Sequence, residues 1–257
     1  MPFALQSSPP MTFEPSQYLL AATAALVVGL SKTGLPGGAI PAVVLMAMVF
    51  PEKSTLSVGA LLPILIIGDV VAVGYYRRDA QWDKLWRLFP FVAIGMIPAC
   101  YVLLNVENRH FRMGLGILVV LLLVLELLRR RFQWKDMPHQ TWFVAGTGLL
   151  TGFGTTVGNA AGPVMSIYAL SMRMAKTEFM GTFAWFFFLV NTSKVPLFLW
   201  MGMITPRTLW LDLTIVPAAL LGAILGRRLL KRLPQRVFDV LVLLLTAVAA
   251  ARLIATA

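Results

Sequence analysis

Two polar, glycine-rich stretches interrupt otherwise apolar segments of this chain of 257 residues. The first runs from Gly29 to Gly38 and contains Lys32, whereas the second runs from Gly152 to Gly162 and has no lysine. Between them they supply hydroxyl, amide and ammonium donors, and neither contains a carboxylate. Such a donor-rich set suits an anion better than a cation. Paired interruptions in an apolar chain also indicate a transport site where two repeats meet. The alternative is that these glycines and small residues simply allow tight helix packing.

A short apolar helix is expected to begin after each stretch, near Ala39 and near Pro163. Proline suits the first helical turn, where its missing N–H costs nothing. The unpaired N–H groups of such helix starts carry partial positive charge and bind anions. We therefore predict an anion site between the two stretches. The predicted substrate-binding residues are Ser31, Lys32, Thr33, Gly34, Gly37, Gly38, Thr155, Thr156, Gly158, Asn159, Gly162, Asn191 and Lys194.

Three ionisable residues lie inside apolar segments, where a charge indicates function by default. Lys32 is predicted to attract the substrate, and the alternative is a lysine that reaches the membrane interface with its ammonium group. Lys194 follows Asn191 on a phenylalanine-rich segment, and this polar patch is expected to face the protein interior. Asp69 lies at nearly the equivalent position of the first half. It has two open interpretations, a coupling group for transport or half of a structural ion pair.

Composition indicates a polytopic membrane protein. Hydrophobic residues make up 58% of the chain, charged residues only 13%, and the mean hydropathy is +0.80. Soluble domains have about 25% charged residues. The net charge of +11 is concentrated in short loops beside apolar segments, which indicates membrane topology and lipid head groups rather than nucleic acid. Residues 1–17 lack a basic region, so no signal peptide is predicted.

The apolar segments form two sets of five. The first set covers residues 18–30, 39–50, 56–75, 88–104 and 111–128, and the second covers 142–153, 162–171, 182–200, 209–225 and 237–254. An offset of 124 residues aligns Gly34 with Gly158, Gly38 with Gly162 and Arg112 with Arg236. This constant offset predicts an internal duplication.

Loop charge predicts how the halves are oriented. The segments beside each interruption have about 12 residues, so they span roughly 18 Å of a hydrocarbon core about 30 Å thick. If each pair forms a hairpin, 15 of the Lys and Arg residues lie on one side and five on the other. This bias places the basic loops in the cytoplasm. Each half then crosses an odd number of times, so the repeats are inverted and both termini are extracytoplasmic.

The expected organisation is an all-α membrane protein built from these two inverted repeats. In each repeat, the first two segments form a short hairpin broken at the glycine-rich polar turn. Residues 1–17 form an extracytoplasmic segment, 18–128 the first repeat, 129–141 a cytoplasmic basic linker and 142–254 the second repeat.

Motifs for enzymatic chemistry are missing from the sequence. His110 and His139 are too isolated for a metal site, and Cys100 is the only cysteine. There is no nucleotide-binding loop and no Gly-x-Ser-x-Gly element. We therefore predict no enzyme activity, no metal and no cofactor.

Two stretches of the chain resemble the pattern of a known membrane family, and they run from Gly29 to Pro41 and from Gly152 to Pro163. Each is a glycine-rich polar break followed by a proline-containing apolar helix. In length, duplication and the placement of breaks, nearly the whole chain resembles the sulfite exporter TauE/SafE family of membrane permeases. The resemblance implies secondary transport of sulfur-containing anions, such as sulfite, sulfoacetate and other organosulfonates, across the cytoplasmic (inner) membrane. The residues by themselves predict only a small anion.

The predicted function is a secondary transporter that exports a small sulfur-containing anion, with a proton gradient as the expected drive. The anion would bind at the midplane between the two hairpin tips. The alternative is a channel, or a permease for another small anion or for a cation or metal, which would use backbone carbonyl groups instead of N–H groups. The expected partners are the anionic substrate and the lipid bilayer, with a homodimer as an open alternative.

Overall fold

The structure, a computed structural model, describes residues 13–34, 39–132, 140–229 and 255. Within those ranges the chain forms nine α-helices and no strand. They are α1 (Pro15–Gly34), α2 (Ile40–Val49), α3 (Leu56–Tyr76), α4 (Trp82–Asn105), α5 (Asn108–Phe132), α6 (Thr141–Gly158), α7 (Gly162–Ser171), α8 (Lys176–Trp200) and α9 (Pro206–Leu229). The all-α prediction is confirmed for this part of the chain.

Five of the described helices are long and apolar enough to cross a membrane. The candidate spans are Leu56–Tyr76, Trp82–Asn105, Asn108–Leu125, Thr177–Trp200 and Pro206–Gly226. About 20 helical residues cover a hydrocarbon core roughly 30 Å thick, and each span comes close to or exceeds that length. The chain is therefore a multi-pass membrane protein, as its composition predicted.

The helices of the second half follow those of the first at the predicted offset. Shifting the bounds of α4 by 124 residues gives the bounds of α9, and the same shift places the end of α1 at the end of α6. The last predicted segment, 237–254, lies outside the described residues. Helix α5 extends into the predicted linker 129–141, as far as Phe132.

The two interruptions are shorter than the sequence predicted. Helix α1 continues to Gly34 and α6 continues to Gly158, so the polar residues of 29–34 and 152–158 are helical. The predicted length of about 12 residues for the segments before each break is therefore wrong, since α1 has 20 residues and α6 has 18. Tertiary packing accounts for the helical part of each stretch, because Gly29 and Gly152 lie at helix crossings, whereas Gly34 and Gly158 are the last residues of α1 and α6.

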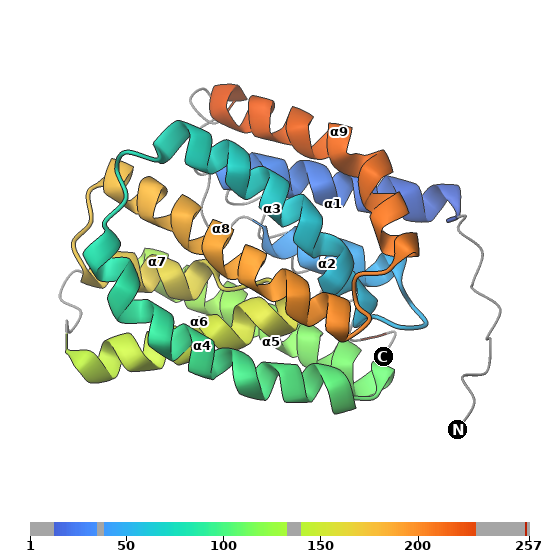
Figure 1. The fold of residues 1–257 in the computed structure, drawn as a ribbon, viewed down its shortest axis with the longest axis horizontal. Helices are drawn as coiled ribbons and strands as arrows, with labels where there is room; N and C mark the ends of the chain where they lie inside the picture. Colours follow the sequence, from blue (N-terminus) through green and yellow to red (C-terminus); the bar gives the residue numbers. More distant parts are fainter. Residues whose placement is uncertain (1–12, 35–38, 133–139, 230–254, 256–257) are drawn as a thin grey trace.

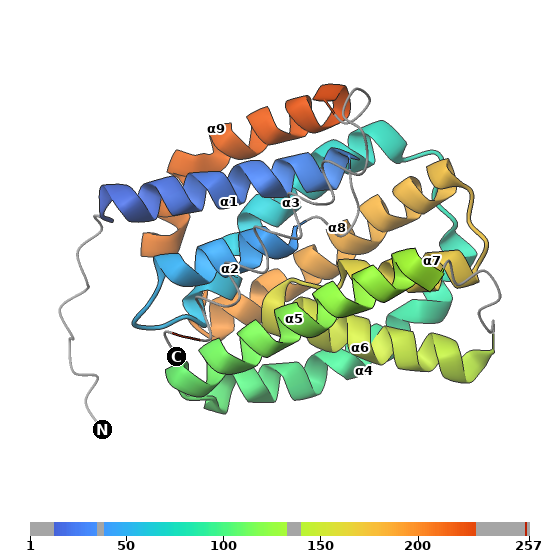
Figure 2. The same ribbon diagram turned by 180° about the vertical axis from the view of Figure 1, so that it is seen from behind.

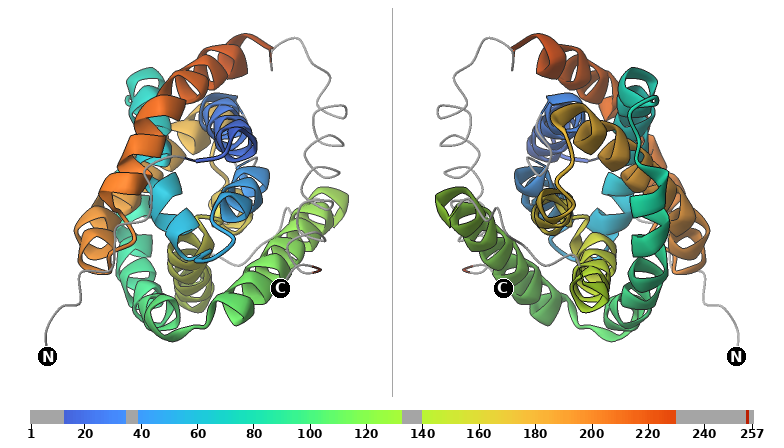
Figure 3. Two further views of the ribbon diagram at one scale, coloured as in Figure 1. Left: turned by 90° about the vertical axis from the view of Figure 1, so that its right-hand side faces the viewer. Right: turned by 90° about the vertical axis from the view of Figure 1, so that its left-hand side faces the viewer.

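The first helix of each half packs against the fourth helix of the other half. Helix α1 contacts α9, and α6 contacts α4. In Figure 1, α9 lies along the top, α3 crosses in front of α1, and α4 and α6 lie below α8. Figure 2, the view from behind, shows α5 on the side nearest the viewer, and Figure 3 shows end-on that α1 and α6 lie on opposite sides of the bundle. This exchange of partners joins the two halves along their length.

Glycines allow these crossings to be close. A Cβ placed on Gly29 of α1 would lie 2.0 Å from the carbonyl oxygen of Ala219 in α9. A Cβ placed on Gly152 of α6 would lie 2.1 Å from the carbonyl oxygen of Val92 in α4. Small residues that let two backbones approach are the usual basis of helix association in membranes.

The loops separate into two groups at the two ends of the bundle. In Figure 1, the loops after α3 and α7 lie at the left end, and the loops after α2, α4 and α8 lie at the right end. The left-hand group includes Arg77, Arg78 and Arg173, and α9 also ends on that side. The right-hand group includes Lys53.

We expect Gly152→Ala to destabilise the protein by about 1–3 kcal/mol, because the new methyl group must push α4 and α6 apart. The measurement is the thermal unfolding midpoint of the purified protein in detergent. Gly146→Ala on the same helix is the matched control, since a Cβ there meets nothing within 4 Å. Equal midpoints for the two variants would contradict the close packing of α4 against α6.

Candidate functional site

A cavity of about 50 Å³ lies between the two halves of the chain. Its walls come from the end of α1, the middle of α3 and α8, and the short connection between α6 and α7. Ala39 and Ile40 bring the start of α2 to the cavity, and Ala160 and Gly162 bring the start of α7. The volume suits a few water molecules or one small ion.

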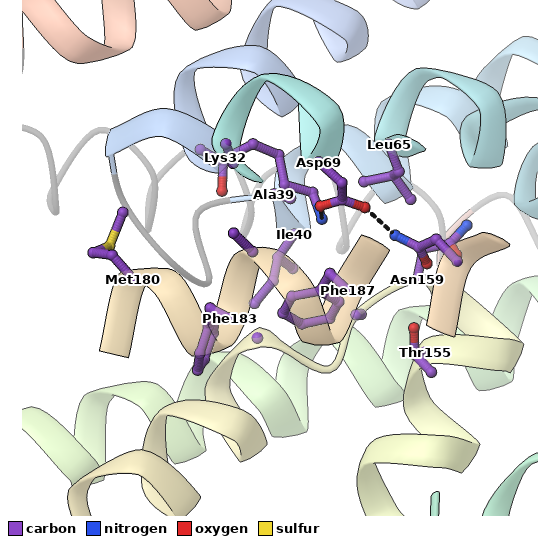
Figure 4. Close-up of a pocket in the computed structure, with 16 residues that line it drawn as sticks. Lys32, Ala39, Ile40, Leu65, Asp69, Thr155, Asn159, Met180, Phe183 and Phe187 are labelled. Carbon is purple, nitrogen blue, oxygen red and sulfur yellow. Dashed lines mark hydrogen bonds and ion pairs between the residues drawn. The ribbon is translucent and has the colours of Figure 1, made fainter. Parts of the chain in front are cut away.

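Lys32 and Asp69 form an ion pair at this cavity. Their Nζ and Oδ1 atoms are 2.6 Å apart, and the Asp69 residue is fully buried. Figure 4 shows the two side chains pointing toward one another from α1 and α3. The amide of Asn191 on α8 donates a hydrogen bond of 2.7 Å to the other carboxylate oxygen of Asp69. One carboxylate therefore links three helices that come from both halves of the chain.

Close packing holds the aliphatic part of Lys32 in place. A Cβ added to Gly68 of α3 would lie 2.9 Å from the Cγ atom of Lys32. The Lys32 ammonium group lies 4.4 Å from the ring centroid of Phe187, a distance at which the ring attracts a cation. About 12% of the Lys32 side chain is exposed, so its ammonium group remains within reach of a ligand in the cavity.

Lys194 on α8 is fully buried beside the cavity and is held by neutral acceptors. Its Nζ atom donates to the carbonyl oxygen of Thr155 at 2.9 Å, to the Thr155 hydroxyl at 3.2 Å and to the side-chain oxygen of Asn159 at 2.7 Å. Thr155 and Asn159 both line the cavity. Lys194 therefore supplies positive charge from behind the residues that a ligand would touch.

Asn159 is the residue at which α6 turns toward α7. Its backbone is left-handed, with φ of 51°, a conformation that asparagine tolerates better than most residues. Its amide nitrogen donates to the carbonyl oxygen of Val58 in α3 at 2.9 Å, while its amide oxygen accepts from Lys194. This side chain ties the connection between α6 and α7 to α3 and α8.

The starts of α2 and α7 give the cavity further hydrogen-bond donors. Helix α2 has no side-chain cap at Ala39, and it has Pro41 in its first turn. N–H groups in a first helical turn have no partner within the helix. Two such ends beside one cavity, one from each half, form an electropositive lining that favours an anion.

The cavity brings together seven of the residues that the sequence singled out. Lining it are Ser31, Lys32, Asp69, Thr155, Asn159, Gly162 and Asn191. Gly37 and Gly38 lie outside the described residues, and Gly34 is the last residue of α1.

Other residues singled out by the sequence lie away from the lining. Thr33 donates a hydrogen bond to the carbonyl oxygen of Ala223 and so joins α1 to α9. Thr156 is buried outside the cavity, and Gly158 packs against Leu115 of α5. Lys194 lies behind Thr155 and Asn159 as described above.

Apolar side chains complete the cavity, and sequence reasoning did not assign them to it. They are Leu65 and Ala72 from α3 and Met180, Phe183, Ala184 and Phe187 from α8. A phenylalanine-rich membrane segment gives no signal that distinguishes a cavity wall from a surface that faces lipid. Within the described ranges, no three His, Cys, Asp or Glu side chains gather in a way that could hold a metal ion.

Comparison with known proteins places the chain in a family. The model of the family described as "Sulfite exporter TauE/SafE" matches residues 20–253. No curated protein matches the chain, and no solved structure matches it. The matched range contains every residue of the cavity and nearly all of both halves. The chain therefore belongs to the sulfite exporter TauE/SafE family, and it is a multi-pass membrane protein of the sulfur-anion transporter type.

Proposed function

We propose that this protein is a secondary transporter that exports a small sulfur-containing anion, sulfite or an organosulfonate, across the cytoplasmic membrane. The anion binds in the cavity between the starts of α2 and α7. The observation that carries the proposal is the meeting of two helix starts and the Lys32 ammonium group at one cavity between the halves. Membership of a family named for sulfite export supports both the substrate class and the direction.

Asp69 is the proposed coupling group. Its carboxylate pairs with the Lys32 ammonium group, so an incoming anion must compete with it. When Asp69 takes up a proton, its charge disappears and Lys32 becomes available to the anion. Binding of the anion and binding of a proton then favour each other, so the protonation of Asp69 is coupled to the occupancy of the cavity.

Alternating access follows from the arrangement of the halves. We propose that they are inverted repeats that move relative to each other around the cavity, as in many secondary transporters. The placement of Arg77, Arg78 and Arg173 at one end supports a cytoplasmic location for that end. Both termini are then extracytoplasmic, and the connections at α1–α2 and α6–α7 are the tips of two opposed hairpins.

A permease for a cation is the rival function. It would need acceptor groups that face the cavity and are free to bind the cation. Asp69 is the only carboxylate that lines the cavity among the described residues, and Lys32 already neutralises it. The donor-rich lining therefore favours the anion.

Transport assays with the protein in liposomes test the proposed substrate class. We expect saturable uptake of labelled sulfite or of a small sulfonate, and we expect a pH gradient to change the rate. Liposomes without protein give the background. Uptake of a divalent cation together with no uptake of any sulfur-containing anion would overturn the proposal. Flux that does not saturate would indicate a channel.

Lys32→Ala should reduce anion uptake about tenfold or more, because it removes a charged hydrogen-bond donor from the cavity and leaves Asp69 buried without its partner. The readout is the initial rate of uptake at low substrate concentration. Arg109→Ala is the control, since it also removes one positive charge but from an exposed position on α5. Wild-type uptake by Lys32→Ala would exclude a role for this lysine.

Asn159→Asp should also lower anion uptake by about tenfold, because the new carboxylate would neutralise Lys194. The aspartate side chain has almost the same shape as the asparagine side chain, so the change is mainly one of charge. Asn159→Gly is the companion variant, since glycine keeps the left-handed backbone without adding charge. We expect a larger loss of uptake for Asn159→Asp than for Asn159→Gly. The reverse order would show that the charge of Lys194 does not contribute.

A further inference from the structure

The charged groups around the cavity add up to a single positive charge. Lys32 and Asp69 cancel each other as an ion pair. Lys194 interacts electrostatically with both, but the acceptors of its Nζ atom are all neutral. The other titratable group close enough to interact is the thiol of Cys100 on α4, which is uncharged in its usual form. The three acceptors around the Lys194 Nζ atom match the three N–H donors of an ammonium group. With Lys194 in this form, one positive charge remains without a negative partner among the described residues.

This surplus limits which anions can bind. An isolated charge in the interior of a membrane protein is costly, so a ligand that brings the net charge around the cavity to zero is favoured. A monovalent anion does so while Asp69 is ionised. A divalent anion would leave a surplus negative charge, and it balances the site only when Asp69 carries a proton.

The surroundings of Asp69 suit both of its protonation states. Lys32 and the amide nitrogen of Asn191 hold the ionised carboxylate. The amide oxygen of Asn191 is buried and has no hydrogen-bond partner among the described residues. A reversed amide would present this oxygen to a protonated carboxyl group as an acceptor. The same side chain can therefore stabilise either state.

We propose that Asp69 sets the charge of the anion that the site accepts, a monovalent anion when Asp69 is ionised and a divalent anion when it is protonated. The inference rests on the proposed transport function and refines it. The natural substrate class at neutral pH is then a monovalent sulfur oxyanion, such as a sulfonate or hydrogensulfite. A divalent anion of the same shape is transported together with one proton.

Methanesulfonate and thiosulfate are a matched pair of probes for this rule. Each has a tetrahedral sulfur with three oxygens, and the fourth substituent is a methyl group in one and a sulfur in the other. They differ by one unit of charge, and both keep their charge over the pH range of an uptake assay. The measured quantity is the ratio of thiosulfate to methanesulfonate uptake in proteoliposomes at several pH values.

In the wild-type protein we expect a low ratio that rises as the pH falls. Asp69→Asn should raise the ratio about tenfold or more and make it independent of pH, because one unit of charge acts at short range in a protein interior. Adding Lys32→Met to Asp69→Asn restores the single positive charge. The double variant should therefore return to the low ratio, still without pH dependence.

Asp212→Asn is the matched control. Asp212 is a buried carboxylate on α9 that does not line the cavity, so the same substitution there should leave the ratio unchanged. If Asp69→Asn alone does not fold, the double variant still decides the question, because it removes both partners and leaves no unpaired charge of the pair. A wild-type pH dependence in the double variant would overturn the rule.

The outcomes also separate this inference from the proposed function. If the wild-type protein moves either probe but Asp69→Asn leaves the ratio unchanged, the charge rule fails and anion transport stands. If neither probe, sulfite nor any other sulfonate is moved by the wild-type protein, the proposed function itself fails.

Discussion

The ion pair between Lys32 and Asp69 is the interaction on which the candidate site depends. A lysine or an aspartate alone at this depth would be costly, and the contact of 2.6 Å lets both persist inside the bundle. The pair also determines where the helices must lie, because Lys32 belongs to α1, Asp69 to α3 and the Asn191 amide to α8. In the proposed mechanism, a substrate anion that contacts Lys32 competes with Asp69.

Close backbone packing positions the pair. Helices α1 and α9 touch where Gly29 meets Ala219, and α6 and α4 touch where Gly152 meets Val92. Each contact joins a helix of one half to a helix of the other, so the cavity is bounded by both halves. Lipid offers no hydrophobic drive between helices, and close contact between small residues replaces it. Gly29 and Gly152, the first glycines of the two polar stretches, thus serve as contact surfaces.

The two lysines near the cavity differ in a way that decides its electrostatics. Lys32 can reach a ligand but is already neutralised, whereas Lys194 is enclosed by Thr155 and Asn159 and has no carboxylate partner among the described residues. One lysine thus supplies a contact that is conditional on Asp69, and the other lies behind the residues that line the cavity. A site of this kind can attract an anion and still release it, because the strongest contact depends on a competing group.

The sequence by itself determined the membrane class, the helical content and the family, because the length of each apolar segment and the order of the polar breaks can be read along the chain. It also identified Lys32, Asp69, Asn159 and Asn191 as polar residues that are costly in an apolar segment. Only the tertiary structure decided that Asp69 pairs with Lys32, that Thr33 joins α1 to α9 and that Lys194 lies behind the cavity wall. Those outcomes depend on which helices cross and at which residue, and the crossings are set by close contacts between segments far apart in the sequence.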